Sequence, residues 1–249
     1  MTTPLRILVT GAGRGIGRSI SEKLLAQGHR VAICARTQSD LDSLSALYPE
    51  SSLAIAADVL AESISESVIA KVTAQWGGID VLILNAGDAV SLPIEKTSDS
   101  VWSHMLDLNL TAPFKFIRAA LPAMKSQNSG NIIVVASKAG LIGEPNVAAY
   151  TAAKHGVVGL VRAAATELNK YGITVNAVCP DFVDTPMIAR SLELAAERTG
   201  KDVKEMRSAL ESKLPGQRLL TPDEVADAVI SFVGNKETNG VTQLLEGGH

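Results

Sequence analysis

The sequence lacks the features that mark several large classes of protein. Its 249 residues include only two cysteines, Cys34 and Cys179, which cannot form a disulfide framework and which favour a reducing compartment. No run of 18 apolar residues is present, and Arg6 interrupts the apolar stretch near the N-terminus, so neither a membrane span nor a signal peptide is predicted. These absences lead us to expect a cytoplasmic protein.

The sequence also lacks a large excess of positive or negative charge, and it lacks metal-binding patterns. The 23 Lys and Arg residues nearly balance the 26 Asp and Glu residues, and the formal net charge is -3 at pH 7. Binding along a nucleic-acid backbone requires a strong positive excess, so we expect no nucleic-acid partner. The four histidines do not stand at the spacing of metal ligands, so we expect no metal site.

What is present is an alternation of short aliphatic runs and amphipathic segments. Seven runs have the length and composition of buried strands, and longer helical patterns separate them. The alternation predicts parallel βαβ units with right-handed crossovers, which place helices on both faces of one sheet. No linker divides the chain, so we expect a single domain over residues 1–249. The predicted strands are Leu5–Thr10, Arg30–Ala35, Leu53–Ala57, Asp80–Leu84, Asn131–Ala136, Ile173–Val178 and Val241–Glu246.

One segment, residues 187–218, differs in character from the rest of the chain. It is polar and contains two helix-like stretches, with Gly200 between them as a predicted helix stop. Each stretch has only a thin apolar stripe, so we expect an insertion that forms a mobile lid over the substrate. The alternative is a subunit contact that does not move.

A glycine-rich turn follows the first predicted strand. Gly11, Gly15 and Gly17 stand in the pattern Gly-x-x-x-Gly-x-Gly, and a predicted helix begins within it. Bare backbone allows phosphates to approach closely, and the helix N-terminus offers N–H groups and the positive end of a dipole. We therefore predict a pyrophosphate site that also includes Arg14 and Ile16. The alternative is a tight turn that binds nothing.

The end of the second predicted strand indicates which dinucleotide binds. An NAD site usually places Asp or Glu there for the ribose 2′-hydroxyl, whereas this strand is followed by Arg36. A guanidinium suits the 2′-phosphate of NADP, and Arg14 adds a second positive group. We expect NADP(H) to be preferred over NAD(H), although Arg36 could also be an ordinary solvated loop residue.

Two further strand ends belong to the same predicted edge of the sheet. Asp58, followed by Val59, closes the third strand; its carboxylate could accept a hydrogen bond from an adenine amino group or cap a helix that starts near Ala61. The small residues Asn85, Ala86 and Gly87 close the fourth strand. They leave room for a flat ligand, although a simple turn would look the same.

Tyr150 and Lys154 stand four residues apart near the start of a long predicted helix, and therefore on one face of it. A free tyrosine has a pKa of about 10, and an ammonium ~4 Å away in a dielectric of ~20 favours the tyrosinate by at most about 4 kcal/mol. Taken alone, such a pair is more often a surface packing pair. Ser137 ends the fifth predicted strand, where its hydroxyl could hold a substrate carbonyl, and Asn109 lies in an upstream helix.

In order and spacing these residues resemble the short-chain dehydrogenase/reductase family, and the resemblance covers essentially the whole chain. It implies a Rossmann-type, doubly wound sheet of seven parallel strands with helices on both faces, and NAD(P)-dependent chemistry between carbonyls and alcohols. The residues that carry it are Thr10–Gly17, Asp58, Asn85–Gly87, Asn109, Ser137, Tyr150 and Lys154.

The resemblance also implies roles for individual residues. Ser137 positions the carbonyl, and Tyr150 is the proton donor. Lys154 lowers the pKa of that tyrosine and holds the nicotinamide ribose, while Asn109 holds a water in the proton relay. Val183 and Thr185 match the positions that contact the cofactor carboxamide, and Pro180 is a further expected cofactor contact.

One departure from the family pattern lies in the same loop. The family usually has Pro-Gly after the sixth strand, whereas here Pro180 is followed by Asp181.

The leading prediction is an enzyme that reduces a ketone to a secondary alcohol with NADPH. A 3-oxoacyl thioester carried on coenzyme A or acyl carrier protein is the favoured substrate, because the chain is similar in length, NADP turn and tail to such reductases. One alternative is a dehydrogenase that oxidises a small secondary alcohol in a catabolic pathway. Another is a cofactor-binding regulator without catalysis, which the filled catalytic positions disfavour. The family resemblance implies a homo-oligomer, a tetramer or dimer.

Overall fold

A computed structural model describes residues 3–247 and contains one sheet of seven strands. The spatial order is β3-β2-β1-β4-β5-β6-β7, and all neighbouring strands are parallel. The strand order reverses between β1 and β4, and open α/β sheets bind ligands at the carboxyl ends of the strands at such a point. The strands are β1 (Arg6–Thr10), β2 (Arg30–Ala35), β3 (Ser52–Ala56), β4 (Val81–Leu84), β5 (Gly130–Val135), β6 (Ile173–Pro180) and β7 (Thr242–Leu245).

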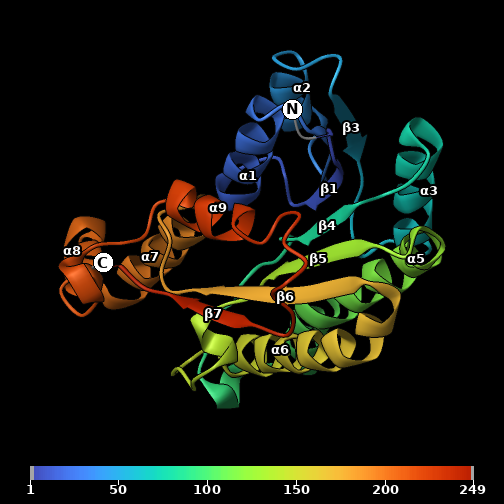
Figure 1. The fold of residues 1–249 in the computed structure, drawn as a ribbon. Coiled ribbons are helices and arrows are strands. Elements are labelled where there is room, and N and C mark those ends of the chain that lie inside the picture. Colours follow the sequence, from blue (N-terminus) through green and yellow to red (C-terminus); the bar gives the residue numbers. More distant parts are fainter. Residues whose placement is uncertain (1–2, 248–249) are drawn as a thin grey trace.

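Helices form a layer on each face of the sheet, as the sequence predicts (Figure 1). The helices are α1 (Gly15–Ala26), α2 (Gln38–Ser45), α3 (Ile64–Trp76), α4 (Asp99–Leu106), α5 (Ala112–Gln127), α6 (Ala148–Leu168), α7 (Pro186–Thr199), α8 (Val203–Glu211) and α9 (Pro222–Ile230). Helices α1, α2 and α9 cover one face, and α3, α5 and α6 cover the other. The doubly wound, single-domain fold is therefore confirmed.

Strand β1 shows why the chain must be covered on both sides. Leu8 packs into the cluster that contains Phe116 of α5, while its neighbours Ile7 and Val9 pack with Val225 of α9. Side chains along a strand point alternately to opposite faces, so a strand with three consecutive apolar residues needs two covering layers.

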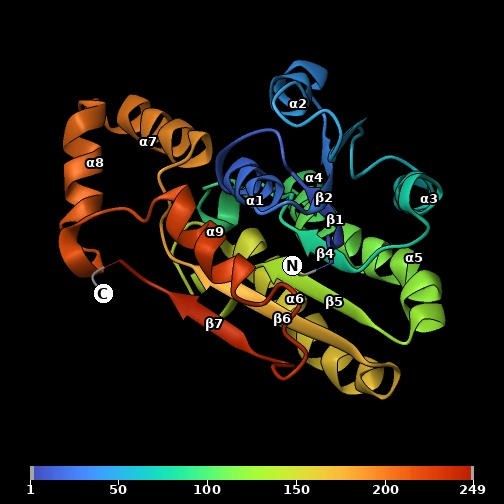
Figure 2. The same cartoon turned by 45° about the horizontal axis from the view of Figure 1, so that its top comes forward.

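The segment between β6 and α9 lies at one end of the sheet, outside these layers (Figures 1 and 2). Helix α7 buries only Leu192 and Ala196, and all nine residues of α8 remain at least partly exposed. Gly200, with φ of +67°, ends α7 as predicted. Within residues 3–247, every helix is too short or too polar to span a membrane.

Candidate active site

The glycine-rich turn occupies the switch point between β1 and β4. Gly11 and Gly15 have φ values of +68° and +54°, a backbone region that favours glycine. A Cβ on Gly17 would collide with the carbonyl oxygen of Gly11, so the start of α1 and the end of β1 can approach closely only without a side chain there. The turn therefore presents backbone rather than side chains.

The start of α1 fits the pyrophosphate of a dinucleotide. Arg14 is the N-cap residue, its side chain makes no capping hydrogen bond, and the first turn contains no acidic residue. The positive end of the helix dipole is therefore not offset by a protein side chain. A Cβ on Gly13 would lie 3.2 Å from that of Ala35, so the turn abuts the end of β2. Arg36 follows directly and is exposed, as is Arg14.

Thr10 and Asn85 join the two strand ends at the switch point. The backbone N–H groups of Asn85 and Ala86 donate to Thr10 Oγ1 at 3.1 and 3.2 Å. The Asn85 side-chain amide donates to the carbonyl oxygens of Thr10 and Gly11 at 3.1 and 3.2 Å. Sequence reasoning did not single out Thr10 by itself; a hydroxyl directly after three aliphatic residues, at the end of the strand, is the signal that could have found it.

Asp58 and Val59 follow β3 at the same edge. Asp58 Oδ1 accepts a hydrogen bond from the backbone N–H of Leu60 at 3.0 Å, and the carboxylate is exposed. Helix α3 begins only at Ile64, with Ser63 as its N-cap. The interpretation of Asp58 as a cap of a helix starting near position 61 is therefore wrong, because its side chain closes a tight turn several residues before the helix.

Gly87, Asn109 and Lys154 converge on one point although they come from distant segments. A Cβ on Gly87 would lie 2.8 Å from Asn109 Oδ1 and 3.7 Å from Lys154 Nζ. Asn109 lies in a short π-helical turn between α4 and α5, and its amide donates to the carbonyl oxygen of Asp88 at 3.0 Å. Among the described residues, its Oδ1 has no hydrogen-bond partner although it is buried. A buried acceptor of this kind needs a donor, such as a bound water.

Tyr150 and Lys154 lie on one face of α6, as their spacing predicts. Lys154 Nζ lies 5.5 Å from the centroid of the Tyr150 ring and donates to the carbonyl oxygen of Val135 at 3.2 Å. Ser137 follows β5 directly and accepts a hydrogen bond from the backbone N–H of Ala139 at 3.1 Å. The Ser137 hydroxyl is close enough to Tyr150 to lower the pKa of the phenol.

The protonation states differ from the sequence-based expectation. Burial raises the pKa of Tyr150 to about 12; Ser137 lowers it, while the carboxylates of Glu144 and Asp88 raise it further. Burial also lowers the pKa of Lys154 to about 8. Burial is the largest contribution, so the pKa of Tyr150 lies above its ordinary value in this structure, opposite in direction to the expected lowering. At neutral pH Tyr150 is a neutral phenol that can donate a proton.

The loop after β6 reaches back to the glycine-rich turn. Pro180 ends β6, and Val183 is buried and forms an isolated bridge with Leu220. A Cβ on Gly15 would lie 3.3 Å from Cγ2 of Thr185, so Thr185 contacts the turn. The predicted site residues from six strand ends and from α6 therefore gather at one edge of the sheet.

Comparison with family models assigns most of the chain to one family. A family model described as short chain dehydrogenase matches residues 6–195, which include the glycine-rich turn and Ser137, Tyr150 and Lys154. The chain belongs to the short-chain dehydrogenase family. It is an NAD(P)-dependent oxidoreductase that acts on the CH–OH and C=O pair.

Individual relatives resemble this short-chain dehydrogenase along nearly its whole length. It is 32% identical to a 3-oxoacyl-acyl-carrier-protein reductase of Escherichia coli strain K12, over 94% of this chain and 91% of the relative. It is 33% identical to a D-beta-hydroxybutyrate dehydrogenase of Cupriavidus necator, over 97% and 96%. A crystal structure of a variant actinorhodin polyketide ketoreductase with NADPH superposes with a TM-score of 0.92 at 33% identity, covering 97% of this chain and 95% of that one.

Proposed function

We propose that this enzyme reduces a ketone to a secondary alcohol with NADPH, and that the ketone is a 3-oxoacyl group held as a thioester on coenzyme A or acyl carrier protein. The observation that carries the proposal is the convergence of Ser137, Tyr150, Lys154 and Asn109 beside the glycine-rich turn. The similarity to the E. coli reductase and to the polyketide ketoreductase supports the substrate class.

Each of the four side chains has its own role in binding the carbonyl or in transferring the proton. The dinucleotide supplies the hydride when it is bound. The Ser137 hydroxyl donates a hydrogen bond to the substrate carbonyl oxygen and holds it beside the Tyr150 hydroxyl. Tyr150, neutral at working pH, donates its proton to that oxygen as negative charge develops there. The Lys154 ammonium stabilises the tyrosinate left behind, and Asn109 Oδ1 holds a water that returns the proton.

The cofactor contacts form a second part of the proposal. The backbone of the glycine-rich turn holds the pyrophosphate, and Arg36 with Arg14 pairs with the 2′-phosphate, which gives the preference for NADP(H). Asp58 and Val59 flank the adenine. The proposed contacts are Gly11, Arg14, Gly15, Ile16, Gly17, Arg36, Asp58, Val59, Asn85, Ala86, Gly87, Tyr150, Lys154, Pro180, Val183 and Thr185.

A second candidate is the oxidation of a small secondary alcohol. The 33% identity to a D-beta-hydroxybutyrate dehydrogenase over 97% of the chain favours it. The same residues would serve this reaction in reverse, with the deprotonated Tyr150 accepting the proton.

An absorbance assay at 340 nm separates these candidates. The purified enzyme is mixed with NADPH or NADH and with acetoacetyl thioesters, the free 3-oxo acid or small ketones, and the reverse reaction is run with secondary alcohols. We expect the highest kcat/KM for NADPH with a 3-oxoacyl thioester. A higher kcat/KM for oxidation of a small alcohol would select the second candidate. Tight NADPH binding without turnover of any compound would overturn the proposal in favour of a regulator.

A further inference from the structure

An ion cluster lies beside Ser137 and has no part in the scheme above. Lys138 Nζ lies 2.8 Å from Asp181 Oδ2 and 2.7 Å from Glu246 Oε1. The three residues follow β5, β6 and β7, which are neighbours in the sheet. One lysine therefore ties three adjacent strand ends together at the catalytic edge.

The burial of the cluster makes its ion pairs necessary. The Asp181 side chain is only 5% exposed, while those of Lys138 and Glu246 are 22% and 28% exposed. A carboxylate so removed from water requires a paired cation, and loss of one partner of such a pair is strongly unfavourable. The two carboxylates raise the pKa of Lys138 to about 12, so the lysine remains charged at neutral pH.

The cluster is connected to Ser137 through the backbone. Ser137 is the N-cap of the 3-10 turn Lys138–Gly140, and its Oγ accepts from the N–H of Ala139. The N–H of Asp181 donates to the carbonyl oxygen of Leu245 at 2.9 Å, which extends the pairing with β7 one residue beyond the end of β6. Asp181 is thus a fixed anchor. The two ion pairs of Lys138 therefore restrain the residue that directly follows Ser137.

We propose that Lys138 is a positioning residue for the reduction. Held between Asp181 and Glu246, it fixes the direction of the Ser137 hydroxyl relative to Tyr150. The expected effect on kcat rests on the proposed function, but the expected effect on the backbone around Ser137 does not. Small misplacements of a catalytic group cost large factors in rate, so loss of Lys138 should lower kcat far more than it weakens NADPH binding.

The test compares Lys138→Met, Lys138→Arg, Asp181→Asn and the double variant Lys138→Met with Asp181→Asn. We expect Lys138→Met to lower kcat roughly 10- to 100-fold, with NADPH affinity changed by less than about threefold. Lys138→Arg should retain most of the rate, because arginine can bridge the same two carboxylates. The double variant should be no slower than Lys138→Met, because both substitutions remove the same interaction. Lys71→Met, at an exposed lysine of α3, is the matched control and should change nothing.

Hydrogen–deuterium exchange of the peptide covering residues 136–142 provides a readout that does not depend on activity. Exchange should be faster in Lys138→Met than in wild type and unchanged in Lys71→Met. If the wild type reduced nothing, the proposed function would fail while this measurement still tested the cluster. The inference would be overturned if Lys138→Met had the kcat and the exchange rate of the wild type. It would also be overturned if the rate losses of the two single variants added up in the double variant. If Lys138→Met does not fold, a reduced kcat in Asp181→Asn and a retained rate in Lys138→Arg are the required results.

Discussion

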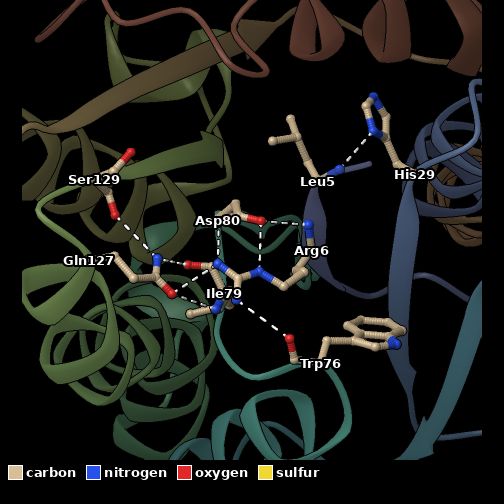
Figure 3. Close-up of polar contacts among 8 residues, drawn as sticks. All are labelled: Leu5, Arg6, His29, Trp76, Ile79, Asp80, Gln127 and Ser129. Carbon is tan, nitrogen blue, oxygen red and sulfur yellow. Dashed lines mark hydrogen bonds and ion pairs between the residues drawn. The ribbon is translucent and has the colours of Figure 1, made fainter. Parts of the chain in front are cut away.

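The polar groups around Arg6, at one edge of the sheet, and around Asn109, at the other, differ in whether protein groups satisfy them. At the amino edge, the Arg6 guanidinium donates to both carboxylate oxygens of Asp80, at 2.8 and 2.6 Å, and to Gln127 Oε1 at 3.1 Å (Figure 3). At the carboxyl edge, Asn109 Oδ1 and Thr151 Oγ1 are buried without a hydrogen-bond partner among residues 3–247. The Arg6 network is satisfied by protein groups, whereas the partnerless Asn109 Oδ1 lies in the candidate site; near the start of β5, Asn131 Oδ1 also has no partner among these residues.

The amino edge is a closed network that joins β1, β4 and α5. Gln127 Nε2 donates to the carbonyl oxygens of Ile79 and Ser129 at 2.9 and 3.4 Å, as Figure 3 shows. A Cβ on Gly78 would collide with Gln127 Oε1, so glycine makes room for the network. The comparison predicts that substitutions in the Arg6 network lower Tm and leave kcat unchanged. Substitutions of the candidate site residues should lower kcat and leave Tm close to that of the wild type.

The largest expected effect is that of Tyr150→Phe on turnover. The substitution removes only the hydroxyl, and general acid catalysis contributes typically 10²- to 10⁴-fold, so kcat should fall by about that factor. NADPH affinity, measured by fluorescence titration, and Tm should stay close to wild type.

Tyr48→Phe is the control for Tyr150→Phe, since Tyr48 precedes β3 at the amino edge and packs beside the core. It should leave kcat unchanged. A Tyr150→Phe enzyme that keeps most of its rate would remove Tyr150 from the mechanism and would break the comparison.

The next effect is that of Arg36→Asp on cofactor choice. The variant loses a charged hydrogen bond of about 1.5–3 kcal/mol to the 2′-phosphate, so NADPH affinity should fall roughly ten- to a hundredfold, while NADH affinity stays similar. The measurement is a titration of both cofactors with wild type and variant. Arg30→Met, an exposed arginine at the opposite end of β2, is the control. Equal affinity of the wild type for NADH and NADPH would contradict the NADP preference.

At the amino edge, Arg6→Met should lower stability without slowing the reaction. Asp80 and Gln127 lose their shared donor, and the loss of hydrogen bonds to a charged group costs about 1–3 kcal/mol. For a domain of this size, that loss corresponds to a Tm lowered by roughly 2–4 °C per kcal/mol. Thermal unfolding and kcat at 25 °C are measured together. A lower kcat with an unchanged Tm would contradict the prediction, because it would show that Arg6 contributes to the reaction rather than to stability.

The fold was predictable because its signals are local. Each strand is a short aliphatic run, and the helices begin and end at patterns such as the glycine-rich turn and Gly200, so the predicted ends of strands agree with the structure within two residues. The positions of the predicted site residues follow from topology, because the carboxyl ends of parallel strands share one edge.

The details that sequence reasoning missed depend on contacts between distant residues. Lys138 stands next to the predicted Ser137, yet its partners Asp181 and Glu246 are 43 and 108 residues away in the chain. The direction of the Tyr150 pKa shift depends on burial, which the spacing of Tyr150 and Lys154 does not reveal. The sequence pattern thus locates the site, and packing sets its electrostatics.

A smaller effect is expected for the mobility of the proposed lid, residues 187–218. Helix α7 is tied to the loop after β4 by Arg190, 2.6 Å from Asp88, and by Arg198, which donates to the carbonyl oxygen of Ser91 at 3.1 Å. The Arg190 and Asp88 side chains are 52% and 30% exposed, and exposed pairs contribute little, about 0–1 kcal/mol. We therefore expect trypsin to cut free enzyme rapidly near residues 198–201 and to cut it several-fold more slowly with NADPH and substrate.

The amino edge supplies the internal reference for the proteolysis experiment. Cleavage at Arg6 should be slow with and without ligands, because its side chain is bonded to Asp80 and Gln127. Equal cleavage rates at residues 198–201 in both conditions would favour the static subunit contact over the lid.

The smallest effect is the acid dependence of the amino-edge network. Burial raises the pKa of Asp80, but the hydrogen bonds and charge of Arg6 outweigh it and leave the pKa below its ordinary value. The native state therefore binds this proton less readily than the unfolded chain, whose Asp has a pKa of about 3.9. The stabilisation is complete well above that value and is lost as the pH falls through the native pKa. In denaturant unfolding, Asp80→Asn should differ most from wild type at pH 7, and the difference should shrink below about pH 4. Glu50→Gln, at an exposed position, should show no such trend, and a pH-independent gap for Asp80→Asn would mean that hydrogen-bond geometry rather than ionisation carries the effect.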